Sequence, residues 1–157
     1  MNNTYGEFGA TEAGMIIGVM LALLLLLAIP TIFWLLTLQK ALGRCRVENQ
    51  AMAPSMVWLM LIPLFNIVWQ FILVINVSKS LKNEFESLNV QPDTAEPGKA
   101  VGLAMCILNV ISAIPYLGSV LGIGSLICWI IHWVKIAGYS SQIASLHVEQ
   151  AVFTEET

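Results

Sequence analysis

The stretch "MVWLMLIPLFNIVW", Met56 to Trp69, is apolar enough for the interior of a membrane, yet its centre holds Pro63 and, three residues later, Asn66. Proline removes a backbone donor and disfavours a helical conformation in the residue before it, whereas Asn is among the preferred residues at helix N-caps. The pattern predicts that one helix ends at Pro63 and that another begins at Asn66. The chain is therefore expected to reverse direction near Leu64.

The composition is that of a membrane protein. Hydrophobic residues form 57% of the 157 positions and charged residues only 11%, against roughly a quarter charged in soluble domains. No later change of composition indicates a second domain, so residues 1–157 are expected to form one transmembrane helical domain. The net charge of −3 and the scattered cations provide no basic face for nucleic acid.

The first predicted span is Gly14–Leu38, which runs 25 residues without a charge, more than the roughly 20 that cross a bilayer. Residues 1–13 are polar and acidic and form an expected extracytoplasmic tail. A cleaved signal peptide would need a positive leader and a shorter apolar core, so the span is expected to stay in the protein. Gly14, Gly18 and Ala22 recur every four residues and predict a face for close helix packing.

The uncharged run Pro54–Val77 allows two topologies, which differ in the side of the membrane on which the lysines and arginines lie. If this run crosses the membrane once as a kinked helix, three cations lie inside and four outside, which violates the rule that cytoplasmic loops keep Lys and Arg. If the chain turns back, all seven are cytoplasmic, so we expect a re-entrant hairpin, with the single crossing as the alternative. The expected cytoplasmic anchors are Lys40, Arg44, Arg46, Lys79, Lys82, Lys99 and Lys135.

The helix that follows the turn is expected to continue beyond the bilayer. An apolar stripe recurs at spacings of four, four and three residues, formed by Val77, Leu81, Phe85 and Leu88. The charged residues Lys79, Lys82, Glu84 and Glu86 are placed outside this stripe. The pattern predicts an amphipathic cytoplasmic extension.

A second stretch, "IPYLGS" at 114–119, repeats the pattern of "IPLFNI" at 62–67, and each precedes an apolar helix that contains Trp and ends in Lys and Ser. This predicts a second hairpin with its turn at Pro115 and Gly118, in which Gly118 and Gly122 allow close packing. Between the hairpins, residues 89–98 are rich in Pro, Asp and Gly and are expected to form a cytoplasmic loop. Residues 141–157 are expected to form a cytoplasmic tail.

The predicted fold class is thus an all-α integral membrane protein. It has one N-terminal spanning helix and two Pro-broken helical hairpins, about four to five membrane helices in all. The N-terminus is expected outside and the C-terminus in the cytoplasm.

Three segments carry a resemblance to known proteins: "MAPSMVWLMLIPLFNIVWQF" (52–71), "VSKSLKNEF" (77–85) and "ICWIIHWVKIAGYS" (127–140). They resemble small multi-helix bacterial inner membrane proteins of a domain-of-unknown-function family. The resemblance covers most of the chain after Arg44 and depends on its Trp, Ile-Pro and Asn positions. It implies a location in the bacterial inner (cytoplasmic) membrane and a helix count, and it implies no activity.

The candidate site residues are the hairpin turns, Pro63, Asn66, Pro115 and Gly118. A helix that begins at membrane depth presents free backbone donors and partial positive charge, the arrangement that transporters direct at anionic groups. The alternative is that Asn66 only caps its own helix. Because non-helical backbone at depth must be buried in protein or line a cavity, the turns predict a homo-oligomer or a subunit of a larger membrane complex, in contact with lipid.

No enzymatic site is indicated. The serines of the apolar runs lack a complementary histidine and acid, and the sequence has no phosphate-binding glycine loop, metal cluster or pair of intramembrane histidines. We therefore expect no metal, no cofactor and no catalytic activity. The leading hypothesis is a scaffold or accessory subunit of an oligomeric membrane assembly. The alternative is a small homo-oligomeric channel or transporter lined by the broken hairpins around Asn66 and Gly118.

Overall fold

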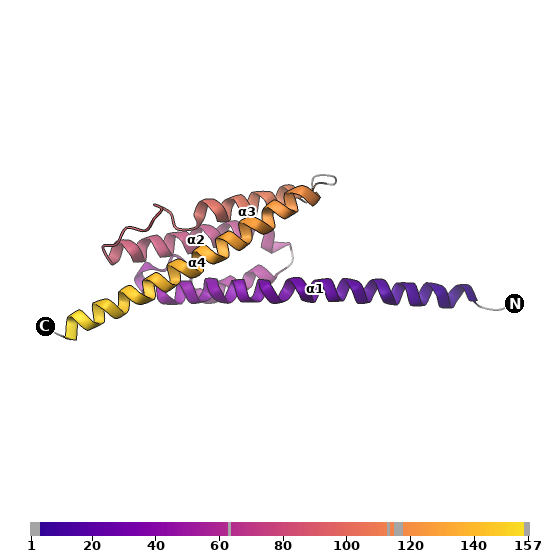
Figure 1. The fold of residues 1–157 in the computed structure, drawn as a ribbon, viewed down its shortest axis with the longest axis horizontal. Helices are drawn as coiled ribbons and strands as arrows, with labels where there is room; N and C mark the ends of the chain where they lie inside the picture. Colours follow the sequence, from indigo (N-terminus) through magenta and orange to yellow (C-terminus); the bar gives the residue numbers. More distant parts are fainter. Residues whose placement is uncertain (1–3, 63, 113, 115–117, 156–157) are drawn as a thin grey trace. The chain divides into compact units, whose positions relative to one another are not determined.

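The computed structural model describes residues 4–62, 64–112, 114 and 118–155, and the regular elements of this part of the chain are all helical (Figure 1). In chain order they are α1 (Thr4–Arg44), η1 (Val47–Asn49), η2 (Pro54–Leu61), α2 (Phe65–Ser87), α3 (Lys99–Ser112) and α4 (Gly118–Glu155). The predicted all-α class is therefore confirmed for these residues.

The chain divides into two compact units, Met1–Trp34 and Leu35–Thr157. The first unit contains most of α1. The second unit contains the remaining elements together with the last residues of α1, from Leu35 onward, and is named the hairpin unit here.

Two helices of the described chain are long and apolar enough to cross a membrane, Thr11–Arg44 in α1 and Val120–Glu155 in α4. The first includes the predicted span Gly14–Leu38, and the side chains at 14–27 are all exposed. An uninterrupted exposed apolar run of this kind suits contact with lipid. The expected polar tail before this span is helical from Thr4 onward.

The first hairpin consists of η2 and α2, which pack side by side (Figure 1). The indole N–H of Trp69 donates to the backbone carbonyl of Met56 at 3.1 Å, although the two residues are 13 apart in the sequence. In one continuous helix they would be separated by about 20 Å along the axis. The chain therefore turns back between Ile62 and Phe65.

The geometry of this turn differs from the prediction. Leu64, with a φ of 65°, occupies the N-cap position of α2, and no side chain forms a capping hydrogen bond there. Asn66 lies within the first turn of α2, where its backbone N–H donates to the Ile62 carbonyl at 3.1 Å. The prediction that Asn66 caps the helix is wrong. Leu64, two positions earlier and with a positive φ, already occupies the N-cap position, so the helix begins before Asn66. Pro63 lies outside the described residues.

The second hairpin consists of α3 and α4, which pack side by side along α3 (Figure 1). At its turn, a Cβ added to Gly118 would lie 2.6 Å from the carbonyl oxygen of Ser112, so the close approach of the two helix ends requires glycine. Pro115 lies outside the described residues. The segment expected as a tail, 141–157, is helical through Glu155.

The core of the hairpin unit includes the predicted stripe of α2. Val77, Leu81 and Phe85 are fully buried and Leu88 is nearly so, which confirms an amphipathic helix beyond the apolar run. Residues 89–98 connect α2 to α3 without a helix, as predicted. Asn89 and Gly98, at the two ends of this connection, have positive φ values.

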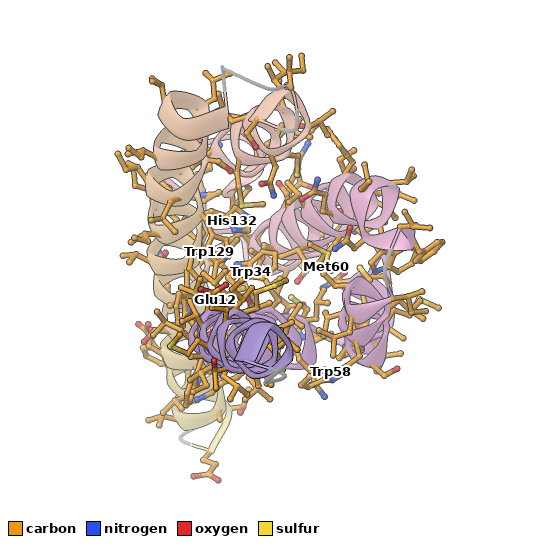
Figure 2. All side chains as sticks on the ribbon, turned by 90° about the vertical axis from the view of Figure 1, so that its right-hand side faces the viewer. Glu12, Trp34, Trp58, Met60, Trp129 and His132 are labelled. Carbon is orange, nitrogen blue, oxygen red and sulfur yellow. The ribbon has the colours of Figure 1, made fainter. Side chains whose placement is uncertain are left out.

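The two hairpins approach each other closely at Gly102 in α3. A Cβ at this position would lie 2.5 Å from Cγ1 of Val74 in α2 and 2.8 Å from Cδ2 of His132 in α4. His132 is only 1% exposed, and Figure 2 shows it pointing from α4 into the bundle. The missing side chain of Gly102 thus makes room for the imidazole ring between three helices.

Replacement of Gly102 tests this packing. We expect Gly102→Ala to lower the free energy of unfolding by about 1 to 3 kcal/mol, because the methyl group overpacks the contact with Val74 and His132. The control is Gly138→Ala in α4, where a Cβ meets nothing within 4 Å and helix propensity favours alanine by up to about 1 kcal/mol. Unfolding in mild detergent measures both variants. Equal stability of the two would contradict the packing described.

Candidate functional site

The candidate site is a buried carboxylate, Glu84, in the C-terminal half of α2. It lies three residues after Leu81 and four before Leu88, so the helical repeat places it on the buried face of α2. Its side chain is 0% exposed. An ionised carboxylate in such a position is costly unless it is paired and hydrogen-bonded.

Three donors satisfy the carboxylate. Oε2 accepts the backbone N–H of Arg46 at 2.7 Å and the side-chain amide of Asn49 at 2.9 Å. Oε1 accepts Nε2 of His147 at 2.8 Å, with Nε of Arg46 at 3.7 Å. Glu84 therefore joins α2, the connection that follows α1, and the C-terminal half of α4.

The hydrogen bonds decide the ionisation state of Glu84. Burial by itself raises the pKa of this carboxyl, but the hydrogen bonds from Asn49, from the Arg46 backbone and from His147, together with the charge of His147, lower the pKa below its ordinary value of 4.5. The balance agrees with the geometry, since a carboxylate that accepts several N–H groups is stabilised in its charged form. Glu84 is thus ionised at neutral pH.

Arg44 and Arg46 form further hydrogen bonds with α4. Nη1 of Arg44, at the end of α1, donates to the carbonyl and to the hydroxyl of Ser140 in α4, at 2.7 and 2.9 Å. Nη2 of Arg46 donates to Oε1 of Gln150 at 3.0 Å. These contacts join the C-terminal half of α4 to the end of α1 and to the connection that follows it.

A second polar cluster holds the connection between α2 and α3 onto α4. The hydroxyl of Tyr139 donates to Asp93 at 2.5 Å and lies 3.3 Å from the hydroxyl of Thr94. Nζ of Lys135, one turn earlier in α4, lies 3.8 Å from the same carboxylate. The predicted loop at 89–98 is therefore pinned along α4 rather than free in solvent.

The residues predicted for helix packing have mostly open surroundings within one chain. Gly14, Gly18 and Ala22 are exposed on α1, and a Cβ at either glycine meets nothing within 4 Å. Gly122 in α4 is equally open, whereas Gly118 contacts the end of α3. A Cβ would therefore have room at Gly14, Gly18 and Gly122.

The predicted turn residues lie at the ends of two different hairpins. Asn66 is half-buried in the first turn of α2, and Gly118 begins α4. A pore formed by these two positions stays a prediction from the sequence, since Pro63 and Pro115 lie outside the described residues.

Sequence reasoning missed Glu84, His147 and Gly102. It placed Glu84 outside the apolar stripe and His147 in the expected tail at 141–157, although Glu84 lies three residues after Leu81 and four before Leu88. Gly102 carried no signal of its own, because its role depends on which helices neighbour it.

The arrangement is suited to holding helices together. Each oxygen of Glu84 already accepts a hydrogen bond from the chain, and its surroundings are the three segments that it joins. No group of three or more His, Cys, Asp or Glu side chains in the described part of the chain is placed to hold a metal ion. We therefore interpret Glu84 as a buried junction of the hairpin unit.

Glu84→Gln tests this junction. At neutral pH we expect a loss of about 2 kcal/mol in the free energy of unfolding, because the charge-assisted hydrogen bonds are lost. Since the folded-state pKa of Glu84 lies below its ordinary 4.5, its contribution is present above that pH and disappears as the pH falls through the folded-state value. The stability difference between wild type and Glu84→Gln should therefore shrink in acid. Glu86→Gln, at an exposed position of the same helix, is the control, and a difference that stays constant with pH would contradict the assignment.

Comparison with protein-family models, with curated proteins and with solved structures finds no match for this chain. Its function is therefore inferred from its own contacts, charges and exposed surfaces.

Proposed function

We propose that the protein is a non-enzymatic integral membrane protein of the bacterial inner membrane, acting as a scaffold or accessory subunit of an oligomeric assembly. In this proposal α1 crosses the bilayer, and the hairpin unit enters it from the cytoplasmic side with the two hairpin turns at depth. The observation that carries the proposal is the separation of apolar and charged side chains along the hairpin unit.

The hairpin tips are apolar and exposed. Exposed side chains at the ends of the two hairpins are Leu61, Ile62, Leu64, Ile114 and Val120. In water, such a concentration of apolar side chains at the end of a bundle is unfavourable, and large exposed apolar patches mark contact with a partner or a membrane.

Contacts between the helices show which residues lie at the same distance from the hairpin tips. Gly118 meets Ser112 at the tip. Further along, Gly102 meets His132, and finally Glu84 meets His147. These pairs give α3 and α4 opposite directions, with α2 parallel to α4.

The cations lie away from the tips. In the hairpin unit, Lys79 and Lys82 lie five and two residues before Glu84, and Lys135 and Lys99 lie farther from the tips than Gly102 and His132. At the same end, Arg44 contacts Ser140 and Arg46 contacts Gln150. This segregation supports the topology in which every lysine and arginine is cytoplasmic.

Two tryptophans accompany the change from apolar to charged surface. The indole N–H of Trp58 donates to Gln39 at 2.9 Å, and that of Trp133 donates to Thr37 at 2.8 Å. Lys40 follows within one turn of α1. Tryptophan is enriched where a membrane meets water, because its ring is apolar and its N–H is polar.

The first limb of each hairpin, η2 or α3, is short for a full crossing, whereas α4 is long enough to cross. The eight residues of η2 rise about 16 Å, and the fourteen of α3 rise about 21 Å. Both are short of the roughly 30 Å of a hydrocarbon core. The scaffold role is supported by α1, whose small-residue face at Gly14, Gly18 and Ala22 is open to a second helix.

Cysteine labelling tests the topology. With the three native cysteines replaced, we expect Glu12→Cys to react with a membrane-impermeant maleimide in intact cells, because the N-terminal side of α1 faces outward. Lys79→Cys and Lys99→Cys should react only after the cells are opened. Reaction of either lysine position in intact cells would refute the re-entrant hairpins.

Size measurement tests the assembly. We expect the double variant Gly14→Leu, Gly18→Leu to have a smaller native mass in mild detergent than wild type, because bulky side chains separate helices that meet at the small-residue face. Gly9→Leu is the matched control, since Gly9 lies nine residues from Gly18, on the opposite face of α1, and a Cβ there also meets nothing within 4 Å. A wild type that is already a bare monomer, or a double variant of unchanged mass, would overturn the scaffold proposal.

A further inference from the structure

We propose that Lys40 and Lys79 bind the phosphates of anionic phospholipids at the cytoplasmic surface of the membrane, so that the hairpin unit prefers anionic over zwitterionic lipid. This inference rests on the membrane insertion proposed above and assigns the class of lipid headgroup that the unit takes.

Lys40 and Lys79 differ from the other lysines and arginines in having no side-chain hydrogen-bond or ion-pair partner in the described part of the chain. All seven lysines and arginines lie in the described residues, and five of them have a protein partner. The pairs are Arg44 with Ser140, Arg46 with Glu84, Lys82 with Glu86, Lys99 with Glu96 and Lys135 with Asp93. Lys40 and Lys79 form no ion pair or side-chain hydrogen bond within the described part of the chain, and both are exposed.

Lys40 stands at the end of an apolar face of α1. Its neighbours Leu38, Ala41 and Leu42 are buried in the hairpin unit, so Lys40 lies on the opposite, outward face. Leu36, one turn before it, is 45% exposed on that same face. The adjacent Gln39 accepts the hydrogen bond from Trp58 at the boundary.

Lys79 has the same position on α2. Ser78 and Ser80 are buried on either side of it, and Lys79 therefore points outward. Ile75, one turn before it, and Ile72 are exposed on the outward face. Each of the two unpaired lysines is thus the first charged residue after an exposed apolar stripe.

This juxtaposition fits a lipid better than a soluble ligand. Acyl chains can cover the apolar stripe while the ammonium group reaches the headgroup phosphate one turn further along the helix. A zwitterionic headgroup neutralises its own phosphate, whereas phosphatidylglycerol keeps a net negative charge that attracts an unpaired lysine. The five paired cations already have their charge or donors occupied by the protein.

The test uses the full-length protein in bilayers of phosphatidylcholine that contain increasing amounts of brominated phosphatidylglycerol, with quenching of tryptophan fluorescence as the readout. We expect wild type to bind phosphatidylglycerol roughly 25-fold more strongly than phosphatidylcholine, since each of the two lysines contributes roughly fivefold. The preference should fall by roughly fivefold for each of Lys40→Gln and Lys79→Gln if each lysine acts at the membrane surface. Lys82→Gln and Lys99→Gln, which remove cations that are already paired, should leave it nearly unchanged.

The outcomes are separable. A wild type without preference, a preference that survives in the double variant Lys40→Gln, Lys79→Gln, or an equal loss in the two control variants would each overturn the proposal. Displacement of the lipid by millimolar inorganic phosphate would also overturn it, because it would indicate a site for free phosphate. Extraction of the protein from membranes by alkaline carbonate would instead refute the membrane insertion itself, whereas retention without lipid preference would refute only the headgroup site.

Discussion

The buried carboxylate of Glu84 is the interaction on which the hairpin unit depends at its charged end. A carboxylate with no exposed surface is tolerated only because the Arg46 backbone, Asn49 and His147 donate to it. Those donors come from segments far apart in the sequence. These hydrogen bonds therefore join the connection that follows α1 to α2 and to the C-terminal half of α4.

The same end of the unit gathers the charged residues, while the opposite end presents exposed leucine, isoleucine and valine at the hairpin tips. This separation within the hairpin unit is the basis for the proposal that its charged end faces water and its tips enter the hydrocarbon. The tryptophans bonded to Thr37 and Gln39 lie where the two surfaces meet. In the topology proposed above, the unpaired Lys40 and Lys79 lie at headgroup level, which links that topology to the proposed preference for anionic lipid.

The glycines of the chain serve two different purposes. Gly102 and Gly118 allow helices of the same chain to approach each other, since a methyl group at either position would collide with atoms of a neighbouring element. Gly14, Gly18 and Gly122 have open space beside them. Small residues in an apolar helix thus predict that a close contact exists, but the spacing alone does not tell whether the contacting helix belongs to the same chain.

The sequence by itself determined the helical class, the apolar run of α1, the connection at 89–98 and the buried stripe of α2, because these follow from composition and local periodicity. Only the tertiary structure decided the N-cap at Leu64, the burial of Glu84, its pairing with His147 and the close contact of His132 with Gly102. The physical reason is that these contacts join residues far apart in the sequence, 35 to 104 residues for the hydrogen bonds of Glu84 and Arg46, and therefore depend on how the helices are placed beside one another. The spacing of apolar residues predicts which face of a helix a residue occupies. Only the packed helices determine which atoms that residue contacts.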